Sequence, residues 1–124
     1  MANILIVDDS GLARRTTRQI LERASHHVVE AEDGFSAIER YFLEKPDLVI
    51  LDVTMRGMDG IEVLTKLREL DTDAAIIIVT ADVQSSTRQM AEDAGASGFV
   101  IKPVQSSLLL EAVKAALDRG ASCN

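Results

Sequence analysis

The chain contains five short runs dominated by apolar residues, each separated from the next by a longer segment with helical periodicity. The runs within the 124 residues are Asn3–Val7, His27–Ala31, Leu48–Leu51, Ala75–Val79 and Ser97–Ile101. Consecutive apolar residues suit strands that are covered on both faces, as in a parallel sheet. The intervening segments place apolar residues three and four positions apart, which is typical of amphipathic helices. This alternation predicts a parallel sheet with helices on both faces.

Right-handed crossovers leave few topologies for five such units. We predict an α/β, flavodoxin-like (βα)5 fold whose five parallel strands follow the order 2-1-3-4-5. The length fits one domain with a genuine core. We expect residues 1–119 to form this domain and residues 120–124 to be a short polar tail.

The helical periodicity also predicts which side chains are buried. Asp59 is expected to cap a helix, with Glu62 completing a capping box, and Gly95 is expected to end the next helix. The expected apolar stripes of the second, third and fourth helices are Phe35, Ile38, Tyr41 and Phe42, then Val63, Leu64, Leu67 and Leu70, then Val83, Thr87, Met90, Ala91 and Ala94.

Composition excludes several classes of function. A net charge of -7 argues against general attraction to nucleic acid or to anionic membranes. The single cysteine, Cys123, can form no disulfide framework and favours a reducing compartment. No targeting signal is visible, and the longest apolar runs are too short to span a bilayer. We therefore expect a cytoplasmic protein with no membrane insertion and no direct contact with nucleic acid.

Charged and polar residues follow four of the five predicted strands. Asp8 and Asp9 follow the first run, Asp52 the third, Thr80 the fourth and Lys102 the fifth. The carboxyl ends of parallel strands meet at one edge of the sheet, so these side chains should converge. Three carboxylates repel one another, by about 4 kcal/mol per close pair at an effective dielectric near 20, unless a cation is present. Hard oxygen ligands favour Mg²⁺ over Zn²⁺.

A carboxylate at such a site can also act as a nucleophile toward phosphorus and form an aspartyl-phosphate. The transition state for phosphoryl transfer needs in-line placement and positive charge around the three equatorial oxygens. We interpret Asp52 as the phosphoryl acceptor. Mg²⁺, the Lys102 ammonium and the Thr80 hydroxyl can stabilise the transferred group.

Four stretches of the chain together resemble the receiver domain of two-component response regulators. They are Ile4–Ser10, Leu51–Met55 with Met58–Gly60, Ile78–Ala81 and Gly95–Pro103. The motifs follow the family's order and spacing, and the resemblance covers residues 3–118. It implies Mg²⁺-dependent phosphorylation of Asp52 by a histidine kinase or phosphotransfer protein, followed by a change in partner binding.

The resemblance also implies roles for individual residues. Asp9 and Asp52 would coordinate Mg²⁺ directly, together with the backbone carbonyl of Thr54, and Asp8 would act mainly through a coordinated water. Lys102 would contact the phosphoryl group.

The remaining implied roles concern switching. Thr80 would swing toward the phosphoryl group while Phe99 turns inward, and the peptide bond before Pro103 would be cis. Thr54 and Asp82 occupy the two positions that tune phosphoryl lifetime in the family. Arg56 departs from the proline that many members carry, so the loop after Asp52 is expected to be more mobile.

Two surfaces are candidates for partner binding. The resemblance suggests that the first helix, with Arg14, Arg15 and Arg18, meets the kinase. An effector protein is expected on the face of the fourth and fifth helices. Three leucines outside the core stripe of the last helix would contribute there if they are exposed: Leu108, Leu110 and Leu117. His26 and His27 are expected at the surface.

The sequence fits three other classes of function less well than this signalling switch. A haloacid-dehalogenase-like phosphohydrolase also uses an aspartate nucleophile, but its acidic pair comes late in the chain, and its second aspartate would fall at Thr54. A flavodoxin-like cofactor binder would need a phosphate-cradling loop and more aromatic residues. A receiver that only binds partners would not need the complete acidic set and Lys102. We expect no enzymatic activity beyond self-phosphorylation and autodephosphorylation.

Overall fold

The computed structural model describes residues 2–53 and 59–122, with side chains as far as residue 118. Within these residues, strands and helices alternate along the chain. The strands are β1 (Asn3–Val7), β2 (His27–Ala31), β3 (Leu48–Asp52), β4 (Ile76–Thr80) and β5 (Gly98–Ile101). The helices are α1 (Gly11–Arg23), α2 (Gly34–Glu44), α3 (Gly60–Leu70), α4 (Ser85–Asp93) and α5 (Ser106–Ser122).

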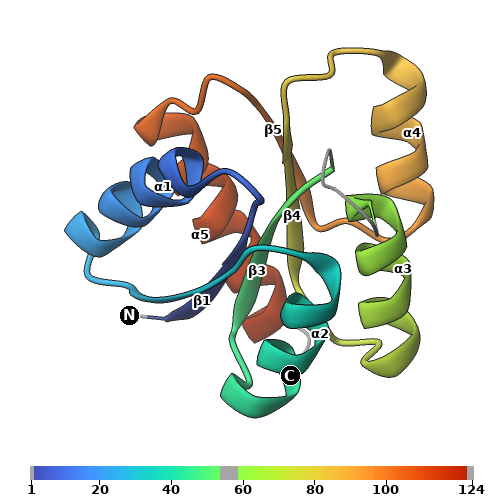
Figure 1. The fold of residues 1–124 in the computed structure, drawn as a ribbon, viewed down its shortest axis with the longest axis horizontal. Helices are drawn as coiled ribbons and strands as arrows, with labels where there is room; N and C mark the ends of the chain where they lie inside the picture. Colours follow the sequence, from blue (N-terminus) through green and yellow to red (C-terminus); the bar gives the residue numbers. More distant parts are fainter. Residues whose placement is uncertain (1, 54–58, 123–124) are drawn as a thin grey trace.

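All neighbouring strands pair in parallel, in the order β2-β1-β3-β4-β5. The predicted flavodoxin-like topology is therefore confirmed. Helices α1 and α5 lie on one side of the sheet, and α2, α3 and α4 lie on the other (Figure 1). Because β1, β3 and β4 are covered on both faces, nearly every residue in them is apolar and buried.

The alternation of side chains along each strand divides the core into two layers. On the side of α1 and α5, Ile4, Ile6 and Ile50 pack with Leu21 and Leu109. On the opposite side, the other strand residues pack with α2, α3 and α4, in a cluster that includes Leu5, Val7, Leu51, Ala37, Leu64, Leu67 and Ala91. Burial of both layers fixes the strand register, because a slip of one residue would exchange the two faces.

Two predicted helix ends are present. Asp59 Oδ1 accepts a hydrogen bond from the backbone N–H of Glu62 at 3.0 Å, and Asp59 is the N-cap of α3. Gly95 follows the C-cap of α4 with a φ of 99°, a left-handed conformation that favours glycine.

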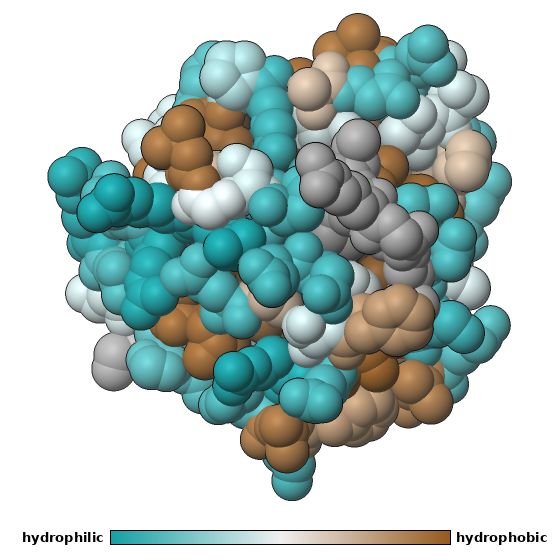
Figure 2. Space-filling model, in the orientation of Figure 1, coloured by the Kyte–Doolittle hydropathy of each residue, from teal (hydrophilic) through white to brown (hydrophobic). Residues whose placement is uncertain are grey.

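The predicted stripe of α2 was wrong for its two phenylalanines. Phe35 and Phe42 are exposed, whereas Ala37 and Tyr41 are buried and Ile38 is half-buried. The inward face is rotated by one residue, because the small side chain of Ala37 allows the helix to approach the sheet closely. The Tyr41 hydroxyl also donates a hydrogen bond to Asp71 Oδ2 at 2.7 Å, which satisfies its polar end. Figure 2 shows the resulting hydrophobic patches over α2.

Three other expected core residues are also exposed. Leu70 is the last residue of α3, Val83 precedes α4, and Met90 faces outward on α4. Among the described side chains of α4, Ala91 alone is buried. Little of this short helix is covered, because it lies at the edge of the sheet and packs against α3. Helix α5 continues to Ser122, so helical backbone extends into the segment expected to be a polar tail from residue 120.

Candidate functional site

The carboxyl ends of four strands bring the predicted site residues to one edge of the sheet. Asp8 and Asp9 follow β1, Asp52 ends β3, Thr80 ends β4 and Lys102 follows β5. The strand register places these ends side by side, since Asp52 pairs with Val79 and Thr80 pairs with Ile101. Polar residues that are distant from one another in the chain therefore lie together at one edge of the sheet.

Three carboxylates form the centre of this site. Asp8 and Asp52 are each only 6% exposed, whereas Asp9 is open to solvent. One oxygen from each of Asp8, Asp9 and Asp52 lies within 4.8 Å of the other two. The backbone N–H of Ser10 donates to Asp8 Oδ1 at 2.9 Å and orients that carboxylate. The three side chains therefore present a concentrated negative charge beside an exposed opening.

Lys102 partly neutralises this charge. Its Nζ lies 3.0 Å from Asp8 Oδ2 and 3.4 Å from Asp52 Oδ2, which draws β5 to the ends of β1 and β3. Burial alone would lower the pKa of Lys102, but the hydrogen bond to Asp8 and the charge of Asp52 raise it above its ordinary value. The side chain is thus held as an ammonium ion beside Asp52.

Thr80 is fully buried, and its contacts lead away from the carboxylates to the start of α4. Thr80 Oγ1 accepts a hydrogen bond from the backbone N–H of Asp82 at 3.1 Å. The Asp82 carboxylate accepts the Thr87 hydroxyl at 2.6 Å and the backbone N–H of Gln84 at 2.9 Å. These two bonds, the Thr87 bond foremost, hold the pKa of Asp82 below its ordinary value. Asp82 therefore anchors the first turn of α4.

Phe99 lies on β5, half-buried against the core layer that faces α2 and α3. The Arg88 guanidinium carbon lies 5.4 Å from the centroid of the ring, within the range of a cation–π interaction. Arg88 and Phe99 also line a surface cavity of about 290 Å³ between α4 and β5. A movement of this ring would therefore alter the surface next to α4.

One further expected feature is present, and two other residues with expected roles lie outside the described part of the chain. The peptide bond between Lys102 and Pro103 is cis, the geometry that the resemblance implies. Thr54, with its backbone carbonyl and its proposed effect on phosphoryl lifetime, and Arg56 lie outside the described residues.

The sequence also matches the model of a known protein family. Residues 4–114 match the model of the response regulator receiver domain. The chain belongs to this family. It is 42% identical over 116 residues to the chemotaxis protein CheY of Bacillus subtilis, which covers 93% of this chain and 97% of the relative. The protein is thus a CheY-like receiver of two-component signalling.

Solved receiver structures show the same fold. A CheY-like receiver from Methanospirillum hungatei superimposes with a TM-score of 0.94 at 30% identity, covering 100% of this chain and 99% of the other. A chain of the CheX–CheY–BeF3–Mg²⁺ complex from Borrelia burgdorferi superimposes with a TM-score of 0.88 at 32% identity, covering 91% of this chain and 87% of the other. The phosphohydrolase alternative is not favoured by these matches.

Receiver domains bind Mg²⁺ at an acidic pocket, and CheY-like receivers interact with kinases and effectors. The donor set of this receiver fits such an ion, because its three converging side chains all offer carboxylate oxygens. Among the described residues, no helix is long and apolar enough to cross a bilayer.

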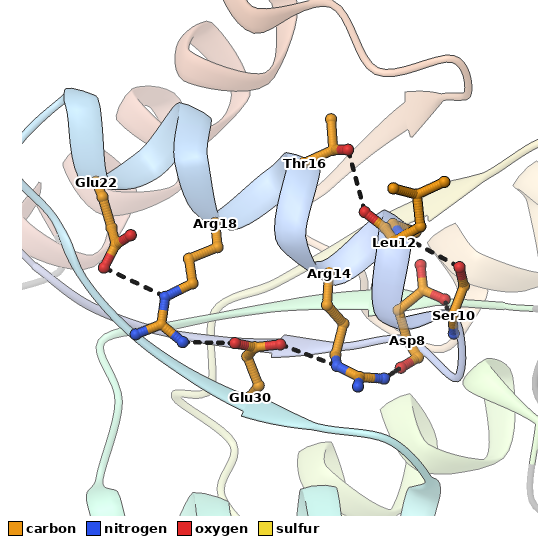
Figure 3. Close-up of polar contacts among 9 residues, drawn as sticks. Asp8, Ser10, Leu12, Arg14, Thr16, Arg18, Glu22 and Glu30 are labelled. Carbon is orange, nitrogen blue, oxygen red and sulfur yellow. Dashed lines mark hydrogen bonds and ion pairs between the residues drawn. The ribbon is translucent and has the colours of Figure 1, made fainter.

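Two residues important to the receiver site were not predicted in this role from the sequence. Gly60 packs directly on Asp52: a Cβ at Gly60 would lie 2.2 Å from the Asp52 carbonyl oxygen. Arg14 donates to the backbone carbonyl of Asp8 at 2.6 Å (Figure 3). The Asp59-Gly60 pair was a visible signal for the first contact, but no local sequence pattern indicates the second.

Proposed function

We propose that Asp52 of this receiver accepts a phosphoryl group from the phosphohistidine of a sensor histidine kinase or phosphotransfer protein, in a Mg²⁺-dependent reaction. The observation that carries this proposal is the position of Asp52. Its carboxylate lies beside the carboxylates of Asp8 and Asp9 and 3.4 Å from the ammonium of Lys102. A nucleophile, a cation-binding group and a fixed positive charge are therefore combined at one edge of the sheet.

In the proposed transfer, an oxygen of the Asp52 carboxylate forms a bond to phosphorus while the phosphorus–nitrogen bond of phosphohistidine breaks. The bonding electron pair stays on the imidazole nitrogen, and a carboxylate nucleophile has no proton to lose. Lys102 donates to a phosphoryl oxygen and so stabilises the charge of the transferred group. When bound by Asp8, Asp9, Asp52 and the backbone carbonyl of Thr54, Mg²⁺ would supply further positive charge.

Phosphorylation is proposed to act on partners through Thr80 and Phe99. The Thr80 hydroxyl, whose oxygen accepts from the N–H of Asp82, would donate a hydrogen bond to a phosphoryl oxygen and move toward Asp52. Displacement of Thr80 would pull on Asp82 and hence on the first turn of α4, while Phe99 turns inward from beneath Arg88. Two packings of this region would then differ in their affinity for a partner.

We propose the surface of α4, β5 and α5 as the effector-binding face. Met90, Ile101 and Leu108 are exposed on these three elements, and the cavity beside Phe99 lies between α4 and β5. Leu110 and Leu117 are only half-exposed and pack against the core, so Leu108 is the leucine that supports the predicted surface. The effector, in this proposal, is a protein that reads the position of α4 and Phe99.

Several narrower predictions remain part of the proposal. Thr54 and Asp82 would set the lifetime of the phosphoryl group, and the chain would have no enzymatic activity beyond its own phosphorylation and dephosphorylation. The expected cytoplasmic location and the absence of nucleic-acid contacts also stay predictions.

The proposal is tested by incubating the protein with acetyl phosphate and Mg²⁺ and measuring its intact mass. We expect one phosphoryl adduct, which is absent when EDTA is present and absent in Asp52→Asn. Asp118→Asn, which changes an exposed aspartate on α5, is the matched control and should form the adduct normally. An unchanged mass at saturating phosphodonor and Mg²⁺ would refute the proposed function.

A further inference from the structure

We propose that Arg14 is a positioning residue for the Mg²⁺-binding carboxylates, and that it acts through the backbone carbonyl of Asp8. This inference rests on the proposed function, because it concerns the same acidic site. It assigns to Arg14 a role within the receiver, while the expected contact of α1 with the kinase stays a prediction.

The Arg14 guanidinium makes two directed contacts with different nitrogens. One terminal nitrogen donates to the Asp8 carbonyl oxygen at 2.6 Å, and Nε donates to Glu30 Oε1 at 2.9 Å (Figure 3). The side chain is only 18% exposed. The Arg14 side chain therefore links α1 to β2 and also contacts Asp8, the residue after β1.

The contact with Asp8 matters because of peptide geometry. The Asp8 carbonyl belongs to the same planar unit as the backbone nitrogen of Asp9. Fixing that oxygen fixes the plane from which both acidic side chains depart. The other groups of Asp8 are also held, since Ser10 donates to Oδ1, Lys102 donates to Oδ2, and the Asp8 N–H donates to the Ala31 carbonyl at 3.2 Å. Arg14 completes this set.

Glu30 anchors Arg14 to the sheet. Its second oxygen, Oε2, accepts from Arg18 at 2.5 Å, and Arg18 Nε lies 3.2 Å from Glu22 Oε2. Burial alone would raise the pKa of Glu30, but the hydrogen bonds from Arg18 and Arg14 outweigh it and lower the pKa. Glu30 thus stays ionised. Because Glu30 pairs with Ile6 in the β1–β2 register, the network is attached to the strand that Asp8 follows.

A purely electrostatic role for Arg14 predicts the opposite result. A positive charge near the carboxylates competes with a dication, so removing it would tighten Mg²⁺ binding. A positioning role predicts that removal weakens binding, because the Asp8–Asp9 peptide loses its fixed orientation. Partners that orient metal ligands typically contribute 10–100-fold to metal affinity. The sign of the change therefore separates the two roles.

The test is calorimetric titration of the purified protein with MgCl₂, in the absence of any phosphodonor. We expect Arg14→Ala to weaken Mg²⁺ binding about 10-fold. Arg14→Lys should recover little of this loss, because one compact ammonium cannot serve both the carbonyl and Glu30. Arg15→Ala removes the same charge from the exposed neighbouring residue and should leave the affinity within about twofold of the wild type.

Glu30→Gln provides a second variant that leaves Arg14 in place but removes its charged anchor, and should weaken Mg²⁺ binding less than Arg14→Ala. Thermal unfolding checks that each variant is folded. Unchanged or tighter Mg²⁺ binding by Arg14→Ala and Arg14→Lys, or an equal loss in Arg15→Ala, would overturn the positioning role while the proposed function stands. Failure of the wild type to bind Mg²⁺ would instead refute the proposed function, and this inference with it.

Discussion

The ammonium nitrogen of Lys102 lies 3.0 Å from Asp8 Oδ2, although 94 residues separate the two in the chain. The contact joins the residue after β5 to the residue after β1, across β3 and β4. It places a fixed positive charge against the carboxylates and links the conformation after β5 to the acidic site. A change in the charge of this site therefore acts directly on Lys102, which follows β5, the strand that also carries Phe99.

Lys102→Met should slow phosphorylation by acetyl phosphate by about 100-fold, the typical loss when one donor to a developing charge is removed. Mg²⁺ binding should tighten in the same variant, because Lys102 no longer competes for Asp8 and Asp52. The initial rate of adduct formation, followed by intact mass, measures the first effect. Lys66→Met, at an exposed position on α3, is the control. Equal rates for the two variants would contradict the role of Lys102.

Gly60→Ala should displace the backbone of Asp52. The new Cβ would lie 2.2 Å from the Asp52 carbonyl oxygen and 2.5 Å from the Val53 Cα, and neither backbone atom can move independently. Overpacking of this kind costs about 1–3 kcal/mol, and we expect phosphorylation to slow as well. Urea unfolding measures the loss. Gly11→Ala, whose Cβ would meet its nearest neighbour at 3.6 Å, should not destabilise the protein; an equal free energy of unfolding for both variants would show that the contact at Gly60 carries no strain.

These two residues illustrate what the sequence could predict of the site. Asp8, Asp52, Thr80 and Lys102 were placed correctly, because a parallel sheet buried on both faces brings the ends of its strands to one edge. The close packing of Gly60 on Asp52 was not predicted, since it depends on how near α3 approaches β3.

The errors in the helices have a related cause. Tyr41 is buried as expected, but Phe35 and Phe42 satisfy a helical spacing as well as Ala37 does, and periodicity alone cannot choose between these side chains. The distance between α2 and the sheet decides which side chain faces inward, and it favours the small side chain of Ala37. The contact of Arg14 with Asp8 was missed because it is made to a backbone carbonyl, which leaves no complementary side chain to find in the sequence.

Thr87→Val should raise the pKa of Asp82 toward its ordinary value, because the hydroxyl that donates at 2.6 Å is removed. A depressed carboxyl pKa stabilises the folded state above the unfolded-state pKa, and this stabilisation is lost as the pH falls through the folded-state pKa. The variant should therefore lose less stability on acidification than the wild type. An NMR titration of the Asp82 carboxyl carbon, with Thr65→Val as the control, checks the shift; an unaltered Asp82 pKa would contradict the proposed anchoring of α4.

His26 should make the protein less stable as the pH falls. Burial, followed by the positive charge of the N-terminus, lowers the pKa of His26, and its Nδ1 accepts the backbone N–H of Ala2 at 3.1 Å. The unfolded chain then binds a proton more readily, so this stabilisation is complete above the ordinary pKa of 6.5 and is lost as the pH falls below it. Urea unfolding from pH 8 to pH 5 should show a weaker pH dependence in His26→Gln than in the wild type. The exposed neighbour variant His27→Gln should retain the wild-type profile, and identical profiles for all three proteins would exclude the effect.

Chemical trapping can locate the phosphoryl group, which we propose is received by the side chain at the end of β3. Borohydride reduces the acyl carbonyl of an aspartyl-phosphate to an alcohol and releases phosphate, which leaves homoserine in place of aspartate. After treatment with acetyl phosphate and Mg²⁺, peptide mapping should find homoserine at position 52, and none when EDTA is present. Homoserine at another aspartate, or at no position despite a measured phosphoryl adduct, would contradict the assignment of Asp52.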